Sequence, residues 1–117
     1  MTKDELITIN KKFVIEVVRL VEVLPSNRVY DAFVRQVVRS SSSIGANYRA
    51  ACRAKSKADF INKLKIVEEE ADETVYFLDL LQEVDSGKNK NVFERLIKEA
   101  NELVSIYVAS IKTIRSK

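Results

Sequence analysis

Apolar residues recur every three or four positions along almost the whole chain, which is the spacing of one face of an α-helix. Three breaks divide this pattern, at Pro25, before Ser56, and in the loop sequence of residues 85–90. We therefore predict four helices, over residues 3–24, 27–53, 57–84 and 91–115.

Capping patterns mark the predicted helix starts, because a Ser, Thr or Asn followed three residues later by an acid satisfies free backbone N–H groups. These starts are Thr2 with Glu5, Ser56 with Asp59, and Asn91 with Glu94, and Ser26 is expected to cap the second helix. Long helices joined by short connections lie antiparallel beside their neighbours. The expected fold is all-α: one domain, residues 1–117, forming an antiparallel up-down-up-down four-helix bundle.

The composition agrees with this fold. The chain has 117 residues, of which 46% are apolar and 32% charged, and it contains only two Gly and one Pro. Cys52 is the only cysteine and there is no histidine, so we expect a small buried residue rather than a metal ligand or nucleophile, and no cofactor. An acidic start without a long apolar run favours the cytoplasm over secretion or a membrane.

The first and third helices carry more apolar surface than one bundle core needs. Apolar residues cover about half the circumference of the first helix, where a stripe about 100° wide would serve. In the third helix, four residues lie outside the core stripe: Ile66, Phe77, Leu80 and Val84. We predict that these faces form a homo-oligomer interface; the alternative is a wide core within one chain.

Charge is segregated along the chain. Residues 26–65 hold nine Lys or Arg and two acids, whereas residues 66–85 hold eight acids and no base. Five arginines of the second helix fall within about 80° on a helical wheel. Forked guanidinium donors suit phosphate oxygens, which favours binding of RNA or DNA; the alternative is pairing with acids of the third helix or of a neighbouring subunit. The candidate phosphate contacts are Arg28, Arg35, Arg39, Arg49, Arg53, Lys55, Lys57, Lys63 and Lys65.

A second group of polar residues lies along one edge of the second helix at helical spacing. We expect it to form a structural network with carboxylates of the third helix, comprising Gln36, Arg39, Ser43, Asn47, Glu70 and Glu73. Glu69, Glu70 and Glu73 could instead be catalytic or metal-binding carboxylates, but bundle di-metal sites use histidine, so we expect no enzyme. The serines at positions 40–43 are expected to allow close helix approach, with a local kink as the alternative.

Residues 36–47, Phe60 and residues 67–74 together resemble a bacterial four-helix-bundle family, the 23S rRNA intervening-sequence proteins. The likeness covers nearly the whole chain. Its pattern, Q-x-x-R-x-x-x-S-[IV]-x-x-N followed by a helix ending in E-[TL], is matched by Gln36, Arg39, Ser43, Asn47 and Glu73. Two places where relatives often have an acid and then Gly are Ala50 and Ala51 here.

The resemblance implies a homopentamer. It also extends to the accessory variability protein of diversity-generating retroelements, a basic pentamer that partners a reverse transcriptase and nucleic acid. The leading hypothesis is therefore a non-catalytic homo-oligomer that binds RNA or DNA without sequence specificity. The alternative is a protein-interaction scaffold that does not bind nucleic acid.

Overall fold

The computed structural model describes all residues, 1–117, and consists of four α-helices. The first, α1, spans Lys3–Glu22, and its capping box is confirmed: the Thr2 hydroxyl accepts from the Glu5 N–H, and the Glu5 carboxylate accepts from the Thr2 N–H. The helix ends two residues earlier than expected. Its last N–H groups, of Val23 and Leu24, bond three residues back, which tightens the final turn before Pro25.

The second helix, α2, spans Arg28–Ala51 without a break across the serine run. The prediction that Ser26 caps it is wrong. Asn27 is the N-cap, its Oδ1 accepting from the N–H groups of Val29 and Tyr30 at 3.0 Å. Ser26 instead donates to the Asp31 carboxylate at 2.9 Å. Asn reaches the second and third N–H groups as well as Ser does, so either residue satisfies the sequence pattern.

The remaining helices are α3, Lys57–Val84, and α4, Lys90–Arg115. Ser56 caps α3 as predicted, accepting from the Asp59 N–H at 3.0 Å. The expected start of α4 at Asn91 is wrong by one residue. Asn89 occupies the cap position without a side-chain cap bond, and the turn before it relies on Gly87, whose φ of 90° disfavours a side chain.

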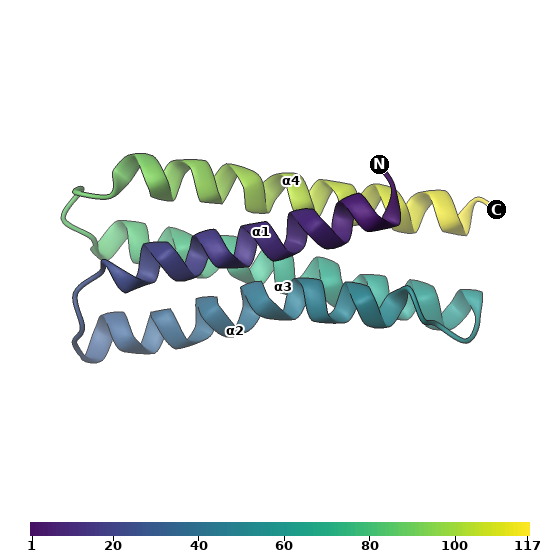
Figure 1. The fold of residues 1–117 in the computed structure, drawn as a ribbon, viewed down its shortest axis with the longest axis horizontal. Coiled ribbons are helices and arrows are strands. Elements are labelled where there is room, and N and C mark those ends of the chain that lie inside the picture. The colour runs from purple at the N-terminus through teal and green to yellow at the C-terminus, as the bar shows by residue number, and fades with distance from the viewer.

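Figure 1 shows the four helices side by side, each antiparallel to the next. Both termini and the turn between α2 and α3 lie at one end, and the other two connections lie at the opposite end. The contacts between α2 and α3 and between α3 and α4 are the most extensive, whereas α1 packs mainly on α2. The predicted all-α, antiparallel four-helix bundle is therefore confirmed. No helix is long and apolar enough to cross a membrane.

The core is one continuous cluster of 21 buried hydrophobic residues contributed by all four helices. Its largest fully buried side chains include Phe93, Ile44, Leu64 and Leu78. Each buried side chain of this size stabilises the fold by roughly 1.5 to 3 kcal/mol relative to an exposed one. The apolar stripes of the four helices thus meet in a single hydrophobic core.

Small residues let α2 and α3 approach closely at mid-height. Ser40 and Ser41 are fully buried, and the Thr74 hydroxyl donates to the Ser40 hydroxyl at 2.8 Å. Both serines also bond to carbonyls one turn earlier on α2, so the buried hydroxyls have partners. A larger side chain at either serine would push the two helices apart.

The other buried polar contact joins α1 to α4. Asn10 is 1% exposed, and its Oδ1 accepts from the hydroxyl of buried Tyr107 at 2.8 Å. The Tyr107 ring packs against Tyr48, with ring centroids 5.6 Å apart. Tyr30 is also buried, whereas Tyr76 is 58% exposed, so three of the four tyrosines belong to the core.

Burial of these rings predicts how stability depends on pH. Burial raises the pKa of Tyr48 to about 12, whereas an unfolded tyrosine titrates near 10. The stabilising contribution is therefore fully present below about pH 10 and is lost as pH rises through 12. We expect the free energy of unfolding, measured by urea denaturation, to fall between pH 10 and 12 less steeply for Tyr48→Phe than for the wild type. Exposed Tyr76→Phe is the control, and an equal change in both variants would contradict the prediction.

Candidate nucleic-acid interface

Five exposed basic side chains without ion-pair partners gather near the turn between α2 and α3. We call Arg49, Arg53, Lys55, Lys57 and Lys65 the basic turn; all five are exposed and none makes an ion pair. The short connection reverses the chain, so the last turn of α2 and the first turns of α3 lie at the same end. Their positive charges therefore gather at one end of the bundle.

Lys63 belongs to the same region but is not free. Its ammonium group contacts the Asp59 carboxylate at 2.6 Å, one helical turn away. Asp59 also accepts from the Lys55 backbone N–H at 3.1 Å, and these contacts, the Lys63 bond above all, lower the pKa of Asp59. Within one chain, the positive charge of Lys63 is thus largely compensated.

Arg39 is also engaged within the chain. Its guanidinium group donates to Glu70 at 3.2 Å, to Glu73, and to the Gln36 amide oxygen at 3.3 Å. The hydrogen bond to Glu73 is the main reason that the pKa of Arg39 is raised. Of the two roles expected for Arg39, the structure shows contacts only for the polar network.

That network is smaller than the sequence pattern suggests. Asn47 donates to the backbone carbonyl of Ser43 at 2.8 Å, inside α2, and neither residue is hydrogen-bonded to Arg39, Glu70 or Glu73. The Thr74 hydroxyl contacts no carboxylate; its two hydrogen-bond acceptors, each at 2.8 Å, are the Glu70 backbone carbonyl and the Ser40 hydroxyl of α2. Helical spacing places these residues on one edge, but it does not say which side chains meet.

Arg28 and Arg35 are exposed and unpaired, but they lie toward the other end of α2. At 1.5 Å per residue, Arg28 stands roughly 38 Å from Arg53 along the helix. The nine candidate phosphate contacts therefore form a long stripe that ends in the basic turn, with a compensated arginine midway.

Three further cations extend the basic end. Lys112 and Arg115, in the last turn of α4, and Lys117, just after it, are exposed, and this end of α4 lies at the same end of the bundle as the basic turn. The sequence pattern alone does not place them with the basic turn, because Lys112 is separated from Lys65 by a whole loop and most of two helices. The up-down topology was the available signal, since it brings the end of the fourth helix beside the turn between the second and third.

The acidic residues of α3 do not gather into a metal site. The structure contains no group of three or more acidic, histidine or cysteine side chains placed to hold a metal ion. Glu70 and Glu73 instead face Arg39. Their arrangement is that of an ion-paired surface.

Fold and surface together define the class: an antiparallel four-helix bundle with a basic end and charged helix faces. The sequence matches the family described as "23S rRNA-intervening sequence protein" over residues 5–109. The chain belongs to that family, as the resemblance of residues 36–47 and 67–74 indicated.

Among solved structures, one similar chain is a protein of unknown function from the S23 ribosomal protein family of Bacteroides thetaiotaomicron. It is 34% identical, with a TM-score of 0.82, and the match covers 95% of this chain and 99% of the other. Comparison with curated proteins gives no match.

The Arg39 network predicts a small, specific loss of stability. Arg39→Met leaves Glu70, whose side chain is only 18% exposed, without its cation, and we expect unfolding to become easier by about 1 kcal/mol. Arg35→Met, on the same helix and unpaired, should change stability by less than about 0.5 kcal/mol. Urea denaturation of both variants tests this, and equal effects would show that the ion pair contributes nothing.

Proposed function

We propose that this protein is a non-catalytic, cytoplasmic homo-oligomer that binds RNA or DNA through the phosphate backbone. One observation carries the proposal: the five cations of the basic turn are exposed and have no carboxylate partner within the chain. Arg28 and Arg35 share this property, whereas Arg39 and Lys63 do not. The primary contact surface is therefore the basic turn, extended by the end of α4.

Binding of this kind is electrostatic and does not distinguish sequences. Arginine and lysine neutralise phosphates and release counterions, so affinity falls steeply with salt. The helices carry no ring of exposed aromatic side chains for base stacking, because three of the four tyrosines are buried. Duplex and single-stranded forms should both bind, through their backbones.

The salt dependence of binding tests this proposal. Five phosphate contacts per chain predict a log-log slope of affinity against salt concentration of about −3.5 to −4.5. Arg49→Glu with Arg53→Glu should abolish the shift of a labelled RNA or DNA oligonucleotide in a native gel at low salt. Lys88→Glu with Lys98→Glu is the matched control, because both are exposed lysines outside the basic turn. A slope near zero, or equal loss in both double variants, would contradict the proposal.

Self-assembly is supported by apolar residues that the bundle leaves outside its core. Ile66 and Val84 are 43% and 44% exposed, and Phe77 and Leu80 are half-buried, all on α3. Residues of α1 contribute too, with Ile9 and Val18 each 37% exposed. Covering such surface in a subunit interface removes it from water, which favours a homo-oligomer, with the pentamer implied by the resemblance as the expected form.

Light scattering coupled to size exclusion tests the assembly. The wild type should elute with several times the chain mass of 13.4 kDa. Ile66→Glu with Val84→Glu should give the monomer mass, because burying two carboxylates in an apolar interface is costly. Val108→Glu, at a 38% exposed position of α4, should leave the assembly intact. A wild type that elutes at 13.4 kDa at micromolar concentration would overturn the oligomer.

The same apolar surface is what favours the alternative function, a scaffold for another protein. Binding of a protein partner, such as the reverse transcriptase implied by the resemblance, stays a prediction. A scaffold without nucleic-acid binding would give no salt-sensitive gel shift, so the experiment above separates the two functions.

A further inference from the structure

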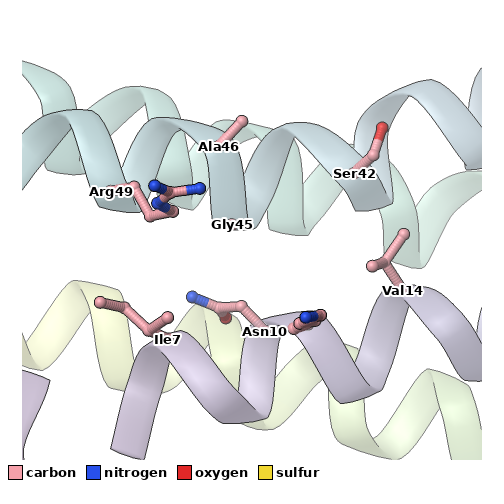
Figure 2. A pocket seen from close by; sticks show the side chains of 8 residues that line it. Ile7, Asn10, Val14, Ser42, Gly45, Ala46 and Arg49 are labelled. Atoms are coloured by element: carbon pink, nitrogen blue, oxygen red, sulfur yellow. The ribbon is translucent and has the colours of Figure 1, made fainter. Parts of the chain in front are cut away.

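A groove with a volume of about 380 Å³ runs between α1 and α2, toward the end that carries the termini. Figure 2 shows Ile7, Asn10 and Val14 on the α1 side, with Gly45 and Arg49 on the α2 side. This volume lies within the range of small-molecule sites, roughly 300 to 1,000 Å³. The groove is separate from the ion pairs of Arg39 and Lys63.

A buried amide group faces this groove without a partner. Asn10 is 1% exposed, and its Nδ2 makes no hydrogen bond. The amide orientation follows from Tyr107, whose hydroxyl proton has no acceptor other than Asn10 Oδ1. The NH₂ group is therefore left toward α2, as Figure 2 shows. Buried donors without partners are rare, because each loses its hydrogen bonds to water without compensation.

The charge of the groove is positive. Lys11 and Arg49 are the only charged residues that line it, and neither makes an ion pair. The hydroxyl proton of Ser42 is already donated to α2 carbonyls, at 2.7 Å for Val38. The groove thus offers an unused donor and two uncompensated cations to an acceptor.

Glycine keeps the middle of the groove open. A Cβ at position 45 would stand 3.4 Å from the Asn10 Cβ, in contact with it. With only hydrogen at position 45, no side chain of α2 stands between its backbone and the Asn10 Cβ. The apolar side chains of Ile7 and Val14 border the groove.

We propose that the groove between α1 and α2 binds a small organic carboxylate with a short aliphatic stem. The carboxylate accepts from Asn10 Nδ2 and is neutralised by Lys11 and Arg49, and the stem lies against Ile7 and Val14. A doubly charged phosphate would need more buried donors than the one amide group supplies. No function described above uses Asn10, so this site goes beyond the proposed nucleic-acid binding.

Hexanoate, titrated against the full chain and followed by ligand-detected NMR, tests the proposal. Hexanoate should bind saturably, more tightly than acetate, which lacks the stem, and more tightly than hexan-1-ol, which lacks the charge. Asn10→Leu should weaken hexanoate binding roughly tenfold or more, because it removes the buried donor to a charged acceptor. Arg49→Gln should weaken it as well, whereas Arg35→Gln, an exposed arginine of the same helix, should not.

Gly45→Ala keeps the Asn10 amide and both cations and favours the helix, but places a methyl group in the groove, in contact with the Asn10 Cβ. It should weaken hexanoate binding, and it decides the test if Asn10→Leu does not fold. Equal binding of hexanoate and hexan-1-ol, or no effect of either variant, would overturn the proposal. The proposal would also be overturned if the wild type did not bind hexanoate and these variants changed the mass of the assembly. That result would indicate a subunit contact at Asn10 instead.

The basic turn and the groove between α1 and α2 share Arg49, so variants at other residues must distinguish nucleic-acid binding from carboxylate binding. Asn10→Leu and Gly45→Ala leave the basic turn unchanged, and both should shift nucleic acid as the wild type does. Loss of carboxylate binding with an intact gel shift supports the groove alone. Loss of both activities in these two variants would mean that the groove has no role separate from the fold.

Discussion

The antiparallel register of α2 against α3 determines the electrostatics of the whole molecule. The register is established at mid-height, where Ser40 meets Thr74 and Arg39 meets Glu70 and Glu73. Both helices rise 1.5 Å per residue and run in opposite directions. A residue a given number of positions after Ser40 on α2 therefore lies level with the residue the same number of positions before Thr74 on α3. Arg49 therefore comes to the level of Lys65, in the basic first part of α3, before its run of acids begins at Glu68.

This arrangement converts a charge pattern in the sequence into one in space. The acids of residues 66–85 can neutralise only the part of α2 up to the level of Glu68, and the ion pairs of Arg39 with Glu70 and Glu73 lie within that stretch. Beyond that level, basic residues face basic residues. A parallel pair of helices with the same sequence would have brought the arginines nearest the turn beside the glutamates, and little free positive charge would remain.

Most of the fold could be predicted from the sequence, because helix periodicity and the capping boxes at Thr2 and Ser56 are local signals. The errors at Ser26 and Asn91 were also local: neighbouring residues of similar cap preference compete, and position within one turn decides. It was harder to predict which side chains hydrogen-bond to one another across helices. The spacing of α2 placed Asn47 with Arg39, yet Asn47 bonds within its own helix. Asn10 was hidden in an apolar helix face, since its partner, Tyr107, is 97 positions away.

Both chain ends emerge at the basic end of the bundle, whereas the 85–89 loop lies at the far end. An affinity tag or fluorescent fusion attached to either terminus would thus be held beside Arg53 and Lys57, and a polyhistidine tag would add imidazole donors to the very surface under study. Internal insertion at Gly87 is the better attachment point, because that exposed turn already departs from helical geometry and nothing lies within 4 Å of a Cβ placed there.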